Sequence, residues 1–194
     1  MVAGWLAGIL ALLAFVPYIS SILRGRTKPS RATWFIWSGL GVLMVLSYRA
    51  SGAESTIWVA VSLVIGPILV ALLSIRYGEG GWSLLDRMCL MGAVLSVLLW
   101  WITGDPLISL CANLAIDFFG LIPTIKKTYH QPGKEDRLAW GITVISNVVN
   151  LLAIDEPSFS VIVYPVYMFI MNGIVLALIL QGSLLPLLGR NHAR

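Results

Sequence analysis

Polar side chains inside apolar stretches are the residues of this chain that could bind a solute or carry a proton. Asp117 lies in the middle of the stretch 106–125, and Asn113 precedes it by one helical turn. Asn172 lies in the middle of the stretch 159–181. An ionised carboxylate in hydrocarbon is costly, so Asp117 is expected to be protonated, paired or turned towards an aqueous cavity. We predict that Asn113 and Asp117 share a polar site, with a structural hydrogen bond to a neighbouring helix as the alternative.

A second set of polar residues follows one face of the next apolar stretch. Thr143, Asn147 and Asn150 are spaced at i, i+4 and i+7, which places them along one side of a helix. One asparagine could bind the solute, although hydrogen bonds between membrane helices, worth about 1 kcal/mol each, explain most such strips. Tyr164 shares its stretch with Asn172 and could line the same cavity.

The composition makes lipid the expected solvent for much of the chain. Of its 194 residues, 58% are hydrophobic and 11% charged, and the mean hydropathy is +0.89. A soluble domain has about 25% charged residues, so the polar side chains are too few to cover a water-facing surface. Seven apolar segments are predicted to be helices, because unpaired backbone cannot face lipid. The segments are 3–23, 32–48, 55–75, 84–103, 106–125, 138–154 and 159–181.

The basic residues predict the orientation of these helices. Of the 13 Lys and Arg residues, all except Arg49 fall on one side of the predicted arrangement, and Glu54, Asp105 and Asp155 fall on the side of Arg49. The positive-inside rule then places the N-terminus outside and the C-terminus in the cytoplasm. The net charge of +4 is explained by this topology and does not indicate a nucleic-acid partner.

Two stretches of the chain repeat each other without a gap at a distance of 106 residues. Pro17 aligns with Pro123, and Trp34 aligns with Trp140, each pair flanking a basic loop. The repeat predicts two parallel halves of three helices with one linker helix between them. The boundaries are 1–76 for the first triple-helix bundle, 84–103 for the linker, 106–182 for the second bundle and 183–194 for a cytoplasmic tail.

The two prolines are predicted hinges. Proline removes a backbone donor and displaces the carbonyl four residues earlier, so a helix kinks there. Pro17 and Pro123 stand late in the first helix of each half, which favours a functional role over a chance occurrence. Trp34 and Trp140 open the next helices. An interfacial belt explains most of the eight tryptophans, but the repeat matches Trp34 and Trp140, which makes them candidate cavity residues that could stack on a ring-shaped solute.

These motifs resemble the PQ-loop transporters, a superfamily that includes the SWEET sugar transporters. The resemblance is closest at Val16-Pro-Tyr-Ile and Ile122-Pro-Thr-Ile-Lys-Lys-Thr-Tyr. It implies an all-α membrane protein of seven helices in a SWEET-like 3+1+3 arrangement. The Gln that usually follows the proline is Tyr18 in the first copy and Thr124 in the second, which indicates a divergent branch and favours a bacterial inner membrane.

The resemblance also implies roles for individual residues. Asp117 stands where an acid couples transport to protons in related carriers, and Asn172 stands in the helix that places an asparagine against the solute in the sugar carriers. Gly66 is the counterpart of Asn172 in the first half, so the paired asparagines of a symmetrical hexose site are absent.

The predicted function is secondary transport of a small polar solute, such as a sugar or an amino acid, by alternating access. Asp117 would couple transport to protons or serve as a polar anchor in a uniporter. The alternative is a membrane receptor or scaffold of the same fold that binds ligand without transport. No enzyme, metal or cofactor motif is present in the sequence, so neither catalysis nor a cofactor is predicted, and self-association is left open.

Overall fold

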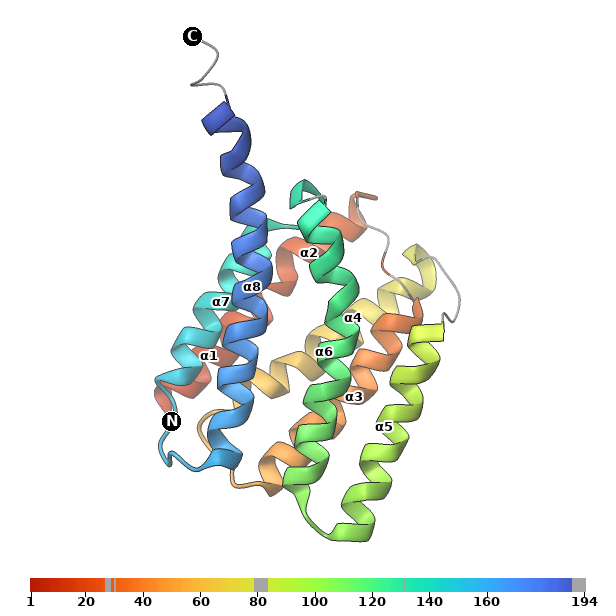
Figure 1. Ribbon diagram of the computed structural model, residues 1–194, viewed down its shortest axis with the longest axis vertical. Helices are drawn as coiled ribbons and strands as arrows, with labels where there is room; N and C mark the ends of the chain where they lie inside the picture. Colours follow the sequence, from red (N-terminus) through yellow and green to blue (C-terminus); the bar gives the residue numbers. More distant parts are fainter. Residues whose placement is uncertain (27–28, 30, 79–83, 131, 190–194) are drawn as a thin grey trace.

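The computed structural model describes residues 1–26, 29, 31–78, 84–130 and 132–189, and the regular structure of that part is entirely helical (Figure 1). Its helices are α1 (Val2–Leu13), α2 (Phe15–Leu23), α3 (Arg31–Ala50), α4 (Ile57–Tyr77), α5 (Leu84–Thr103), α6 (Pro106–His130), the 3-10 turn η1 (Pro132–Lys134), α7 (Arg137–Leu151) and α8 (Phe159–Gly189). The predicted segments all coincide with helices. The first is divided between α1 and α2, and the last continues to Gly189, eight residues beyond the predicted end at 181.

Within the described residues, three helices are long and apolar enough to cross a membrane: Val2–Leu23, Ile57–Tyr77 and Phe159–Gly182. Shorter apolar helices cover Trp34–Ala50, Leu90–Thr103 and Pro106–Ile122, whereas α7 falls in neither group. Large apolar side chains also cover much of the surface. On α5, for example, Trp101 and Ile102 are 82% and 74% exposed. An apolar surface of this extent is compatible with a membrane protein, because lipid is its natural contact.

By chain order, the helices on either side of α5 are divided here into a first group, α1, α3 and α4, and a second group, α6, α7 and α8, and α5 lies at the edge (Figure 1). In the first group, α4 contacts both α1 and α3. In the second group, α8 contacts both α6 and α7. The two groups meet where α1 packs on α7 and where α3 packs on α6, and α5 lies against α6 and α3.

Side chains satisfy the backbone groups at several helix ends. Asp105 Oδ1 accepts a hydrogen bond from the Leu107 amide at 2.8 Å at the start of α6, and Asp136 Oδ1 accepts one from the Ala139 amide at 2.9 Å at the start of α7. At the end of α4, the Arg31 guanidinium donates to the carbonyls of Ser74 and Gly78, both at 3.0 Å. These contacts fix where the helices begin and end.

Small residues allow α1 and α4 to approach closely. The backbone of Gly8 lies against Trp58, so that a Cβ atom at position 8 would be 2.7 Å from the Trp58 Cβ. At the same contact, the Ser62 hydroxyl donates to the Gly8 carbonyl at 2.6 Å. Close backbone contact and a hydrogen bond to a carbonyl are the main attractive terms between helices where lipid surrounds the protein.

Each proline inside a helix leaves one carbonyl without its usual partner, and the structure treats these carbonyls differently. Pro17 cannot donate to Leu13, and α1 ends at that residue. In α8, Pro165 cannot donate to Val161, and the Tyr48 hydroxyl from α3 donates to the Val161 carbonyl at 2.6 Å instead. A residue of the first group therefore satisfies a backbone acceptor of the second group.

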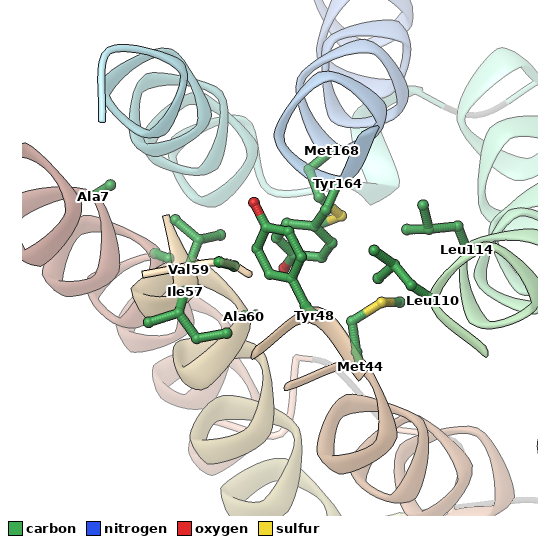
Figure 2. Packing of buried hydrophobic residues seen from close by; sticks show 12 residues of the cluster. Ala7, Met44, Tyr48, Ile57, Val59, Ala60, Leu110, Leu114, Tyr164 and Met168 are labelled. Carbon is green, nitrogen blue, oxygen red and sulfur yellow. The ribbon is translucent and has the colours of Figure 1, made fainter. Parts of the chain in front are cut away.

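Two apolar clusters form the interior. The larger one joins residues of α1, α3, α4, α6 and α8, with Tyr48 and Tyr164 at its centre (Figure 2). Their rings lie 4.7 Å apart between centroids at 37°. The smaller cluster joins α6 and α8 through Leu121, Val175 and Ile179, with Trp140 of α7 packed against it.

Candidate functional site

Asp117 is held by one phenol at the contact between α6 and α8. The Tyr167 hydroxyl donates to Asp117 Oδ2 at 2.8 Å, and both side chains are half-buried. In the part of the chain that the structure describes, no cation forms an ion pair with this carboxylate. Tyr164, on the same helix as Tyr167, also lies within electrostatic reach of Asp117. The site therefore combines an acid with neutral hydroxyl groups, an arrangement that can accept and release a proton.

Asn113 and Asp117 point to different partners although they lie one turn apart on α6. Asn113 Oδ1 accepts a hydrogen bond at 2.7 Å from the hydroxyl of Ser96 on α5, and the Ser96 hydroxyl lies 3.3 Å from that of Ser109. Asn113 is fully buried, and its Nδ2 has no partner. In this conformation Asn113 connects α6 to the edge helix, whereas Asp117 connects α6 to α8.

Asn147 and Asn172 donate hydrogen bonds to the same backbone carbonyl group. Asn147 Nδ2 of α7 donates to the Met168 carbonyl at 3.2 Å, and Asn172 Nδ2 donates to the same oxygen at 2.7 Å. Both side chains are buried. Asn147 Oδ1 remains without a partner. The structure thus joins two asparagines that come from different predicted sets.

Asn150 and Tyr164 are completely buried and make no side-chain hydrogen bonds through their terminal atoms. Neither Nδ2 nor Oδ1 of Asn150 has a partner, and the Tyr164 hydroxyl has none. The contact between Asn147 and Met168 sets the register of α7 against α8. Because the two helices are antiparallel, one turn onwards on α7 corresponds to one turn back on α8, which brings Asn150 to the level of Tyr164.

The two tryptophans matched by the repeat lie in different surroundings. Trp34 packs at 5.3 Å from the ring of Tyr18 and at 5.3 Å from that of Trp37. Trp140 donates through Nε1 to Glu135 Oε2 at 3.2 Å and packs on the smaller apolar cluster. In the described part of the chain, neither ring forms a hydrogen bond with an asparagine, so the geometry gives no support to a stacking role in solute binding.

The predicted hinges also differ. The helix is interrupted at Ala14, three residues before Pro17, whereas α6 continues from Pro106 to His130 through position 123. The side chain of Pro123 lies outside the described residues. A break in one half and a continuous helix in the other means that only Pro17 coincides with an interruption in this conformation.

Two apolar grooves lie on the described part of the molecule, and neither is lined by Asp117 or by an asparagine. One, of about 430 Å³, follows α2 along Val16, Ile19, Ser20, Leu23 and Arg24. The other, of about 190 Å³, lies between α3 and α4. Within the described residues, no three His, Cys, Asp or Glu side chains are grouped so that they could hold a metal ion.

The sequence prediction missed Tyr167 and Tyr48, which make the polar contacts between helices described above. Tyr167 follows Tyr164 by three residues, so helical periodicity could have placed it on a neighbouring face. The partner of Tyr48 is a backbone carbonyl 113 residues away, and no side-chain pattern signals such a partner. Comparison with family models, with curated proteins and with solved structures found no match to this chain.

Proposed function

We propose that this chain is a secondary transporter of a small polar solute, built as two parallel triple-helix bundles of the PQ-loop type. The bundles would rock about the contact between them, with the N-terminus outside the inner membrane of a bacterium. In this proposal Asp117 takes up and releases the coupling proton. The observation that carries it is a half-buried acid in an apolar helix, held by one neutral phenol between α6 and α8 of the second group.

The helix boundaries support the repeat. A shift of 106 residues moves Arg31, the first residue of α3, onto Arg137, the first residue of α7. The same shift moves the span Val2–Leu23 to 108–129, within α6, and moves α4 to 163–183, within α8. The third helix of each half is therefore the one that packs between the other two.

The contacts between the two groups support the same relation. The shift of 106 residues pairs α1 with α6 and α3 with α7 as counterparts. Replacing each helix by its counterpart turns the contact of α1 with α7 into the contact of α6 with α3, as expected for a two-fold relation between the halves. The weaker pairs, α4 with α7 and α3 with α8, exchange in the same way. Inward and outward conformations of similar energy are easiest to build from two such related halves.

The test of this function is solute-driven proton movement into liposomes that contain the purified chain and a trapped pH dye. Sugars, amino acids, nucleosides and small organic acids are supplied outside at acidic and neutral pH. At least one class is expected to change the internal pH. Asp117→Asn is expected to reduce this signal at least tenfold, because an amide cannot exchange the proton, while the melting temperature stays close to that of the parent.

Tyr167→Phe is the matched variant for this test. It keeps the acid and removes only the hydroxyl that positions it, so proton movement is expected to persist at a rate reduced several-fold. Unchanged proton movement in Asp117→Asn would remove the coupling role. Specific binding of a solute with no flux under any gradient would assign the receptor function instead.

A further inference from the structure

Unpartnered polar atoms gather in the second half of the molecule. Among the described residues, the buried side-chain nitrogen and oxygen atoms without a hydrogen-bond partner belong to Asn113, Asn147, Asn150 and Tyr164. All four residues follow position 105. A buried polar group without a partner destabilises the folded chain, and water is scarce in a membrane interior. Such groups persist where a molecule that the structure does not contain completes their hydrogen bonds.

Three of these residues belong to α7 and α8, which pack against each other. Asn147 is bonded to the Met168 carbonyl and leaves its Oδ1 open, and Asn150 lies one turn away with both amide atoms open. Tyr164 lies at the level of Asn150 by the register of the two helices, and its hydroxyl is open. Asn113 is apart from this group, because it is bonded to Ser96 on α5.

The open atoms are uncharged and include both donors and acceptors. Asn147 Oδ1 and Asn150 Oδ1 accept, Asn150 Nδ2 donates, and the Tyr164 hydroxyl does either. Their surroundings are apolar, since Tyr164 and Met168 belong to the larger apolar cluster (Figure 2). An anion here would meet no cation of the described residues, and the neighbouring carboxylate, Asp117, is already bonded to Tyr167.

We infer that Asn147, Asn150 and Tyr164 form the solute site of this carrier. The site lies within α7 and α8 and is not shared equally by the two halves. It binds an uncharged solute through the hydroxyl or amide groups of that solute. This inference rests on the proposed function. Proton and solute then occupy neighbouring but separate groups, the proton on Asp117 and the solute on the two amides and the phenol.

Solutes of similar size that differ in charge test the inference. The purified full chain in lipid nanodiscs is titrated with glucose, gluconate and glucosamine, and with lactamide and lactate. A ligand of the native state raises the melting temperature in proportion to its binding. Glucose, lactamide or both are expected to raise it, and their charged counterparts are expected to have no effect at the same concentration.

Two variants locate the site. Asn150→Met introduces the residue found 106 positions earlier, Met44, and Tyr164→Phe removes one hydroxyl. Each is expected to weaken binding of the uncharged probe about tenfold, because the probe loses a hydrogen-bond partner. Without the probe, each is expected to melt at the same temperature as the parent or higher, since an unpaired buried group has been removed. Thr143→Val is the control, because the Thr143 hydroxyl is bonded to the Ala139 carbonyl of its own helix; it should bind as the parent does.

The outcomes separate this inference from the function on which it rests. If the uncharged probes bind, bind more weakly to Asn150→Met and are not transported, the proposed site is supported and the proposed transport function is excluded. Transport of a charged solute that is unaffected by Asn150→Met would retain the transporter and overturn the site. Failure of all five probes to bind also overturns it. A lower melting temperature of Asn150→Met with unchanged probe binding also overturns the inference. It would show that Asn150 has a structural role and that water completes its hydrogen bonds.

Discussion

Residues 1–76 and residues 106–182 differ in character at several positions that are 106 residues apart. At six positions related by the shift of 106 residues, the first half has a small or apolar residue and the second half has a polar one. The pairs are Ala7 and Asn113, Ala11 and Asp117, Gly41 and Asn147, Met44 and Asn150, Val61 and Tyr167, and Gly66 and Asn172.

One of these pairs shows how the same contact is made twice. In the first half, Gly41 allows α3 to approach α4 so closely that a Cβ would lie 2.6 Å from the carbonyl of Leu63, which Pro67 leaves without its usual donor. In the second half, Asn147 reaches the backbone of α8 with a side-chain amide. Close packing and hydrogen bonding are alternative ways to join helices in a membrane. Close packing leaves no polar side-chain atom at the contact, whereas a side-chain amide can leave an oxygen or nitrogen atom available to a ligand.

The largest expected effect comes from moving a polar residue into the first half. In Gly66→Asn the new side chain would occupy the space of the Phe15 ring, which packs directly on Gly66. The α2–α4 contact would open, and the variant is expected to lose about 3 kcal/mol of stability. The reverse change, Asn172→Gly, removes one hydrogen bond to a carbonyl within its own helix and weakens the helix, for a loss of about 1 kcal/mol. Reversible unfolding in mixed micelles measures both, and equal losses would contradict the asymmetry.

A smaller effect is expected at the two stacked tyrosines, one from each half. The Tyr48 hydroxyl bonds to the Val161 carbonyl at 2.6 Å and to the Thr56 hydroxyl at 2.7 Å, whereas the Tyr164 hydroxyl has no partner. Tyr48→Phe is therefore expected to cost about 1 to 3 kcal/mol, because the Val161 carbonyl loses its donor. Tyr164→Phe is its matched control and is expected to leave stability unchanged or slightly higher. The same unfolding measurement tests the pair, and a larger loss in Tyr164→Phe would count against the assignment of partners.

The smallest effect concerns a hydrogen bond between the loop before α4 and the loop before α8. The Ser55 hydroxyl donates to Asp155 Oδ2 at 2.8 Å, and this bond lowers the pKa of Asp155 below its usual value of 3.8. Since the folded-state pKa is depressed, the stabilisation is present above pH 3.8 and is lost as the pH falls through the lowered pKa.

The loop contact is tested with Asp155→Asn at several pH values. The variant should melt slightly below the parent near neutral pH, because the charge-assisted bond is lost, and the difference should shrink as the pH falls below 3.8 through the lowered pKa of Asp155. The effect is small because solvent screens an exposed carboxylate. Glu156→Gln changes the charge of the same loop next to the contact and serves as the control. A difference that grows in acid would exclude the assigned role of Asp155.

The helices could be predicted from sequence because each is an apolar run bounded by charges, glycine or proline. Gly52 and Gly104, for example, follow α3 and α5 with positive φ angles of 100° and 68°. The partners of the polar residues could not be predicted, since they depend on the register between helices far apart in the chain. Asp117 meets Tyr167 fifty residues later, and Asn113 turns towards α5, although the two share one face of α6. Periodicity gives the face of a helix but not the neighbour that it meets.

The shortness and polarity of α7 also have a consequence for how the chain is made. This helix has 15 residues, three of its buried side chains are Ser146, Asn147 and Asn150, and it does not qualify as a membrane span by length and hydropathy. A segment of this kind is held poorly by a translocon that admits helices one at a time. It is expected to partition into the bilayer as a hairpin with α8, whose Met168 carbonyl receives the Asn147 amide. During biosynthesis, the polar groups on which the proposed function depends would therefore delay integration of the second half until the last helix has left the ribosome.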